Sequence, residues 1–163
     1  MDRLWAPWRI QYVSSSASTR EEQCFLCIDR KDDEKAFVIG RNEKAFVVMN
    51  RFPYTNGHVM VVPVRHVGSI EELTDEELLD MMKLVQKMSG VFKKEFNIDG
   101  LNIGINMGRA AGAGLEGHIH IHIVPRWFGD TNFMPVIGET KIISEHITET
   151  FRKLKRRFVE KLL

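Results

Sequence analysis

The sequence predicts an α+β fold: a mainly antiparallel sheet, with a long helix after the first strands and a second helix at the C-terminus. Three observations lead to this prediction. Strand-like and helix-like segments follow one another in the order strands, helix, strands, helix. Two of the strand pairs have links too short for a parallel crossover, so their strands should run antiparallel. The length of 163 residues suits one domain.

The chain divides into three predicted parts. Residues 1–23 form an irregular arm that holds two of the three tryptophans, Trp5 and Trp8, which we expect to pack on the domain rather than remain in water. Residues 24–140 form the domain itself. Residues 141–163 form a helix whose apolar positions recur with helical spacing, and we expect it to pack on the same domain or on a dimer partner.

Five segments have the composition of β-strands. They are short, rich in Val and Phe, and bounded by turn residues such as Gly and Asn. These segments are residues 35–40, 44–50, 58–64, 101–107 and 118–125. A glycine-rich loop over residues 108–117 joins the last two strands.

The long helix is predicted to run from Thr74 to about Phe96. Thr74 and Glu77 have the spacing of a capping box, in which each residue's side chain bonds to the backbone of the other. Apolar residues then recur at helical intervals. They are Leu78, Met81, Met82, Val85, Met88 and Phe92. We expect the methionines of this stripe to belong to the core rather than to a ligand surface.

Composition argues against a nucleic-acid or membrane partner. Lys and Arg number 23 against 22 Asp and Glu, and a net charge of +1 does not attract the molecule to DNA or to an acidic membrane. No apolar run approaches the length of a membrane span, and the N-terminus lacks the apolar stretch of a signal peptide. With two cysteines and no export signal, we expect a reducing compartment, the cytoplasm.

Three histidines alternate with isoleucines just before the predicted end of the last strand. Because side chains alternate along a strand, His118, His120 and His122 should share one face and the isoleucines the other, buried face. The outer two histidines would lie about 13 Å apart, too far for all three to bind one zinc ion. One alternative is a strand with internally satisfied histidines. We favour a nucleophile with helpers, since an imidazole can attack phosphorus and form a covalent intermediate.

Two further segments are weak indicators when taken singly. The stretch from Asn50 to His58 contains Pro53 and Gly57 and predicts a hairpin loop with these two polar residues at its ends. The glycine-rich loop follows Asn106 and leaves backbone N–H groups able to face phosphate oxygens. Either segment alone would be an ordinary turn.

Cys24 and Cys27 form a Cys-x-x-Cys pair. Three interpretations of this pair are open: two core cysteines, a redox pair, or two zinc ligands. The βαβ unit expected beside a redox pair is missing from the predicted order of elements. A zinc site needs two more ligands, and His66, which directly follows a strand, has no other evident role. The residues slightly favour zinc.

Taken together, these residues resemble the histidine-triad (HIT) superfamily. Its signature is His-x-His-x-His followed by apolar residues, here His118 to Val124. Asn50, Pro53 and the Gly-His pair ending at His58 are similar to the nucleoside-binding hairpin of the diadenosine polyphosphate hydrolase branch. The Cys pair and the N-terminal Arg-Leu-Trp-Ala-Pro-Trp-Arg are similar to the branch related to diadenosine tetraphosphate phosphorylases.

The resemblance implies an enzyme that cleaves the α-phosphate linkage of dinucleoside polyphosphates or related nucleotides through a nucleotidyl-histidine. It implies that His120 is the nucleophile and that His122 and His58 assist at the phosphates. It also implies a nucleotide substrate, with a divalent cation possible alongside it, and a homodimer held by the long helix or the C-terminal helix. The implied nucleotide-binding residues are Asn50, Phe52, Asn106 and Gly114.

Zinc-containing members of the superfamily bind the metal with the first triad histidine, a Cys pair and an upstream histidine. The resemblance therefore implies a structural zinc ion. The corresponding ligands here are Cys24, Cys27, His66 and His118. One departure is that many members carry a hydroxyl residue shortly before the triad, whereas residues 113–117 contain none.

Two other functions stay open: a nucleotide-binding module with residual activity, and a zinc-stabilised nucleic-acid binder. For an enzyme, we expect apolar residues near the hairpin to wall the base and polar groups to hold the phosphates. The expected wall residues are Phe46, Val48, Phe52 and Val59.

Overall fold

The computed structural model describes residues 24–138 and 143–160. The predicted arm, with Trp5 and Trp8, lies outside the described residues. Among those described, no helix is long and apolar enough to cross a bilayer.

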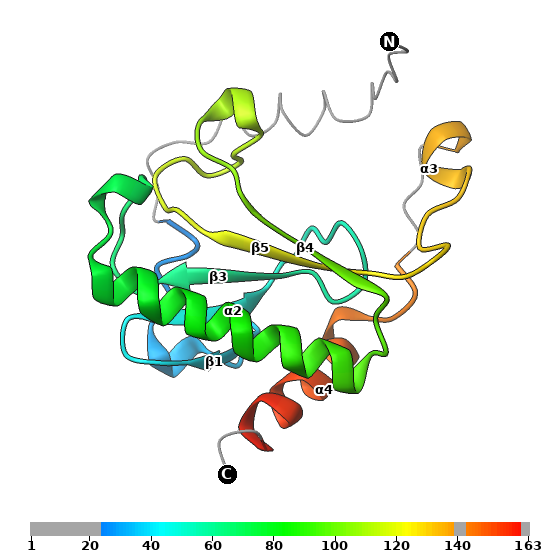
Figure 1. Ribbon diagram of the computed structural model, residues 1–163, viewed down its shortest axis with the longest axis horizontal. Helices are drawn as coiled ribbons and strands as arrows, with labels where there is room; N and C mark the ends of the chain where they lie inside the picture. The colour runs from blue at the N-terminus through cyan, green and yellow to red at the C-terminus, as the bar shows by residue number, and fades with distance from the viewer. Residues whose placement is uncertain (1–23, 139–142, 161–163) are drawn as a thin grey trace.

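One antiparallel sheet forms the centre of the molecule (Figure 1). Its strands are β1 (Val38–Arg41), β2 (Ala45–Met49), β3 (Val59–Pro63), β4 (Gly100–Ile105) and β5 (Ile121–Arg126). They lie in the order β1-β2-β3-β5-β4, and every neighbouring pair is antiparallel. The predicted fold class is therefore confirmed, although the last strand starts three residues later than predicted.

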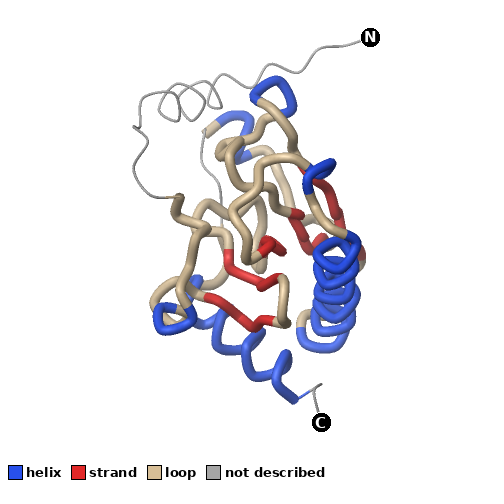
Figure 2. The backbone as a smooth tube through the Cα atoms, turned by 90° about the vertical axis from the view of Figure 1, so that its left-hand side faces the viewer, coloured by secondary structure: helices blue, strands red, loops and turns tan. Residues whose placement is uncertain are grey.

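Two helices pack on one face of this sheet, α2 (Asp75–Glu95) and α4 (Ile147–Glu160) (Figure 2). Their buried residues form a single core with the strand residues that point toward them. On the opposite face, the segment that contains Cys24 and Leu26 packs on a smaller apolar cluster from β1, β2 and β3. The remaining helices are short: 3-10 turns at Arg30–Asp32, Ile70–Glu72 and Arg109–Ala111, and α3 (Met134–Ile137).

The start of α2 is fixed by its predicted capping box. The Thr74 hydroxyl accepts a hydrogen bond from the Glu77 backbone N–H, and the Glu77 carboxylate accepts one from the Thr74 N–H. Met81 and Met88 are buried in the core, as predicted. Met82 is 54% exposed, because it lies beyond the edge of the apolar stripe that faces the sheet.

The C-terminal helix α4 packs on the same chain. Its buried residues Phe151, Leu154 and Phe158 belong to the helix-side core. The Phe158 ring lies so close to Gly40 in β1 that a Cβ built on that glycine would be 2.1 Å from it. The apolar face of α4 is therefore used within the chain.

Candidate active site

The buried isoleucines hold the triad in place. Ile119, Ile121 and Ile123 all lie in the helix-side core, as the alternation predicted. His118 and His120 precede β5 rather than lying in it, and this segment is anchored where the Ile119 N–H donates to the Val67 carbonyl at 2.7 Å.

The expected open row of three histidines is wrong. His118 is fully buried and His120 is 7% exposed, whereas His122 is half-buried. The sulfur atoms of Cys24 and Cys27 lie against Nδ1 of His118 and help to enclose its ring. The strand period alone did not account for a chain segment that crosses this face.

His120 has the features of a neutral nucleophile. Its Nδ1 lies 2.9 Å from the His118 carbonyl oxygen, which can only accept, so we assign the ring proton to Nδ1. The Nε2 atom then carries the free lone pair. Burial lowers the pKa of His120, although the bond to His118 acts in the opposite direction. The ring is thus neutral and fixed in the tautomer that can attack through Nε2.

A chain of hydrogen bonds assigns the other two protons in the same way. The Tyr54 backbone N–H donates to His58 Nδ1 at 3.1 Å, so the His58 proton must be on Nε2. That atom lies 3.0 Å from His122 Nδ1 and donates to it. His122 therefore carries its own proton on Nε2. Burial, together with the neighbouring His120, lowers the pKa of His122 to about 4, which keeps the ring neutral.

These rings form a row that runs from the hairpin across to His122 in β5 and then along the same segment to His120. Ring centroids are 4.5 Å apart for Tyr54 and His58, 5.1 Å for His58 and His122, and 4.7 Å for His122 and His120. Tyr54 was not predicted as a site residue. Its place in the hairpin, four residues before His58, is the only signal for it in the sequence.

The residues predicted to bind nucleotide have different settings. Asn50 has its amide nitrogen 3.3 Å from His58 Nδ1, and its oxygen accepts from the Phe52 N–H. Phe52 is 74% exposed on the hairpin. The Asn106 amide lies 3.5 Å from the Gly112 carbonyl, at the start of the loop that contains Gly114.

One residue of the predicted apolar wall for the base needs correction. Phe46 and Val48 are buried in the smaller cluster, on the same face of the sheet as His122, which pairs with Met60 of that cluster. Val59 is buried in the helix-side core and cannot face the site. It directly follows His58, and consecutive strand residues point to opposite faces.

A cleft of about 770 Å³ opens beside His122. Residues of β4 and β5 form its floor. Gly104 in β4 pairs with His122 and has no side chain, and no atom lies within 4 Å of where its Cβ would be. The space above this part of the sheet is therefore open. Its far wall includes Trp127 and Phe128, which follow β5 directly. Sequence reasoning missed this wall, although a Trp-Phe-Gly-Asp turn so close after the triad was a usable signal.

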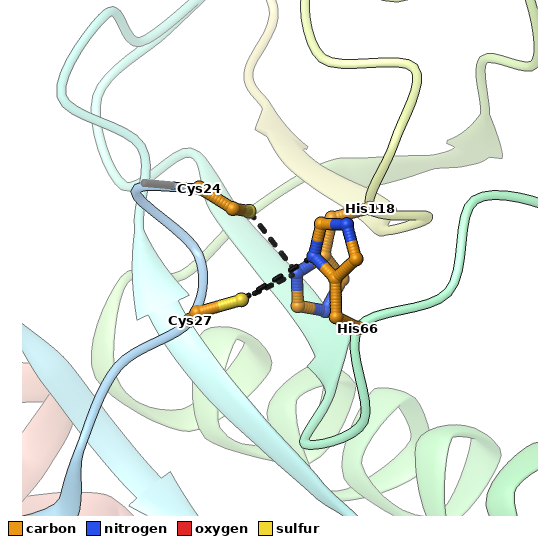
Figure 3. Close-up of side chains that lie close together, drawn as sticks. All are labelled: Cys24, Cys27, His66 and His118. Atoms are coloured by element: carbon orange, nitrogen blue, oxygen red, sulfur yellow. Dashed lines mark hydrogen bonds between the residues drawn. The ribbon is translucent and has the colours of Figure 1, made fainter. Parts of the chain in front are cut away.

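The four predicted metal ligands come together from three parts of the chain (Figure 3). Cys24 Sγ lies 3.3 Å from His118 Nδ1, and Cys27 Sγ lies 3.3 Å from His66 Nδ1 and 3.7 Å from His118 Nδ1. All four ligand atoms lie within 4.8 Å of one another. Zn–S and Zn–N bonds of about 2.3 and 2.0–2.1 Å put ligand atoms of a tetrahedral site about 3.3–3.8 Å apart. The donor set therefore fits zinc.

His118 connects this cluster to the nucleophile. Its Nε2 donates to the Pro63 carbonyl at 2.9 Å, which leaves Nδ1 to face the sulfur atoms. Its backbone carbonyl accepts the hydrogen bond from His120. The same residue thus faces the metal-binding cluster with its ring and holds the nucleophile with its backbone.

Comparisons with known proteins agree with this geometry. The family model described as the HIT domain matches residues 31–129. An AP-4-A phosphorylase of Mycobacterium tuberculosis is 38% identical over 94% of this chain and 83% of its own length. An uncharacterized HIT-like protein of Methanocaldococcus jannaschii is 33% identical over 81% of this chain and 98% of its own.

A solved structure, that of a Zn-bound histidine triad family protein from Mycobacterium smegmatis, superimposes with a TM-score of 0.69 at 26% identity. The match covers 90% of this chain and 96% of the other. These matches extend over most of this chain and over most of each relative. This chain belongs to the HIT domain family.

Proposed function

We propose that this protein is a nucleotide hydrolase or nucleotidyltransferase that cleaves the α-phosphate linkage of dinucleoside polyphosphates through a covalent bond to His120. The supporting observation is the hydrogen bond from His120 Nδ1 to the His118 carbonyl, which leaves Nε2 as a free lone pair beside His122. The names of two relatives agree with this substrate class: the AP-4-A phosphorylase, and a bis(5'-adenosyl)-triphosphatase of Dictyostelium discoideum that is 42% identical over 52% of this chain.

In the first step, the Nε2 lone pair of His120 attacks the α-phosphorus. A P–N bond forms while the P–O bond to the rest of the phosphate chain breaks. The electron pair of that bond leaves on the phosphate oxygen, and the Nε2–H of His122 donates a hydrogen bond to the charge that develops there. His58 is a positioning residue, because it acts through His122.

In the second step, water or inorganic phosphate attacks the phosphorus of the nucleotidyl-histidine. The P–N bond breaks, its electron pair returns to His120 Nε2, and the acceptor's proton leaves to solvent. His120 keeps its Nδ1 proton throughout, bonded to the His118 carbonyl. The resting tautomer is thereby restored. We also propose that the polyphosphate enters with a divalent cation, the usual companion of nucleotide phosphates.

We further propose a structural zinc ion bound by Cys24, Cys27, His66 and His118. Four donors of the right type and spacing support it, as does the zinc bound by the related Mycobacterium smegmatis protein. Zinc would fix the geometry of the segment before β5, and no chemical step passes through it. Two reduced thiols held beside imidazoles favour the cytoplasm.

We propose a homodimer as well. Within the described residues, β4 is an edge strand, and its Ile103 is 49% exposed. Leu79 and Met82 on α2 are also more than half exposed, so apolar surface remains for a second copy. The apolar face of α4 is already used within the chain. Light scattering at micromolar concentration should give twice the mass of the chain, and a monomer would overturn this proposal.

We do not propose nucleic acid as a partner. The basic residues of α4 form ion pairs with carboxylates of the same chain: Lys153 pairs with Glu145, and Arg156 and Arg157 pair with Glu95. These pairs leave little unbalanced positive charge on that face.

The decisive experiment is intact-protein mass spectrometry during turnover of diadenosine tetraphosphate. We expect a nucleotidyl adduct that is acid-sensitive and base-stable, maps to His120, and is absent from His120→Ala. His146→Ala is the matched control, because His146 is exposed and is the one histidine of the six outside both the cluster and the ring row. Undiminished turnover by His120→Ala would overturn the mechanism. Tight binding of the compound without any turnover by the wild type would favour a nucleotide-binding module.

A further inference from the structure

We infer that the cleft beside His122 binds the second nucleoside of the substrate, the one that departs with the leaving group, by stacking its base on Trp127 and Phe128. The inference rests on the proposed function. It assigns a site to the half of the substrate that is not attached to the attacked phosphorus.

The position of the cleft follows from the direction of the reaction. The leaving phosphate must meet the Nε2–H of His122, since Nδ1 of that ring is bonded to His58. His122 and Asn106 are both walls of the cleft, so a chain of phosphates that passes His122 continues into this space. The volume of about 770 Å³ is in the range of sites that hold small organic ligands.

The aromatic wall is fixed by hydrogen bonds from its backbone and from the Trp127 indole. The Trp127 indole N–H donates to the Phe96 carbonyl at 3.1 Å, and its backbone N–H donates to the Asp130 carboxylate. The Phe128 N–H donates to the Asp99 carboxylate at 2.7 Å, yet its side chain is 94% exposed. An aromatic side chain that stays exposed on a fixed turn has an unfavourable solvation free energy, and no packing contact compensates for it. A base that stacks on it would remove that cost.

The charge of the cleft favours a nucleoside over a free anion. Its only charged wall residues among the described part of the chain are Arg126 and Asp130, which pair with each other. Most of its other polar walls are amides and hydroxyls, including Asn102 and Thr131, which suit the hydroxyls of a ribose. The phosphates would remain near His122 and Asn106, and the neutral end would hold the nucleoside.

The test compares diadenosine tetraphosphate with adenosine 5'-tetraphosphate. The two compounds share the attacked α-phosphate and the chain of four phosphates, and the mononucleotide lacks the second adenosine and has one more ionisable oxygen on its terminal phosphate. We expect Phe128→Ala and Trp127→Leu to lower kcat/KM about tenfold for the dinucleotide, as expected for a lost stacking contact, and to leave the mononucleotide within about twofold. Phe133→Ala is the matched control, because Phe133 is 65% exposed nearby but is not a wall of the cleft.

Binding gives a readout that does not need turnover. In a His120→Ala background, calorimetry should show the dinucleotide binding about tenfold more tightly than the mononucleotide, and Phe128→Ala should remove that difference. Equal affinities, or equal losses of kcat/KM on both compounds, would overturn the inference. A change of oligomeric state in Phe128→Ala would also overturn it, since the wall would then be a subunit contact. Absence of turnover in the wild type, with the binding difference intact, would count against the proposed function alone.

Discussion

Replacing His58 with phenylalanine tests the hydrogen-bond chain that fixes the proton of His122. His58 is fully buried, and a phenyl ring, although somewhat larger than imidazole, keeps a planar aromatic group in contact with Tyr54. The change removes the hydrogen bond from the Tyr54 N–H at 3.1 Å, the one to His122 Nδ1 at 3.0 Å, and the contact with the Asn50 amide nitrogen at 3.3 Å. The unpaired Tyr54 N–H should cost about 1 kcal/mol of unfolding free energy, the low end of the usual 1–3 kcal/mol, because the hairpin is near solvent.

The effect on turnover has two physical bounds. One neutral hydrogen bond contributes about 1 kcal/mol, or roughly fivefold. Complete loss of a proton donor to the leaving group costs about 10²–10⁴ in rate. His122 itself remains in the variant with a less fixed ring, so we expect kcat/KM for diadenosine tetraphosphate to fall about tenfold, near the lower bound.

The assay that separates positioning from general damage is leaving-group dependence. The phenyl ester of AMP has a leaving group with a pKa of about 10, like tyrosine, and the p-nitrophenyl ester has a much more acidic one. His58→Phe should lose more activity on the phenyl ester, because its leaving oxygen depends more on the His122 hydrogen bond. Thr150→Val removes a buried hydroxyl that bonds to Asn56 of the same hairpin and is the control. Equal losses on both esters would refute the reasoning.

Three further predictions concern the metal and the fold. Cys24→Ala with Cys27→Ala should reduce zinc from about one ion per chain to near zero by elemental analysis, while His146→Ala keeps it; unchanged zinc content would exclude these ligands. The hydrogen bond from Arg65 lowers the pKa of Glu77 to about 2, below its unfolded value, so its contribution to stability is present above about pH 4.5 and disappears as the pH falls through 2. Urea titrations should show this slope, and Glu77→Gln should flatten it. Leu154→Ala in the helix-side core should cost about 2–5 kcal/mol of unfolding free energy, measured by the same titrations.

Local patterns predicted the local structure well. Thr74 and Glu77 are three residues apart, and both hydrogen bonds of their capping box form as the spacing requires. The alternation of isoleucines before and within β5 predicted which side of the segment is buried. In both cases the determining residues are neighbours in sequence, so the chemistry of one element decides the outcome.

The site depends on contacts that no local pattern contains. The bond between His58 and His122 joins residues 64 positions apart, and the contact between Cys24 and His118 joins residues 94 positions apart. The burial of His118 follows from the second of these and contradicted the open row that the strand period predicted. The four metal ligands were predicted together only through a resemblance to a family, because spacing alone left the partners of the Cys pair open.

The double role of His118 has an evolutionary consequence. Its ring faces the metal-binding cluster, while its carbonyl orients His120 and its Nε2 is bonded to β3. Cys24, Cys27 and His66 make no such contact with the nucleophile among the bonds described, so a lineage that dispensed with the metal would be free to replace all three at once. A substitution at position 118 keeps the backbone carbonyl that supports His120 but removes the side-chain bond to β3, so it alters the setting of that carbonyl together with the metal ligand. Mutation of Cys24, Cys27 or His66 therefore separates loss of the metal from loss of catalysis more cleanly than mutation of His118.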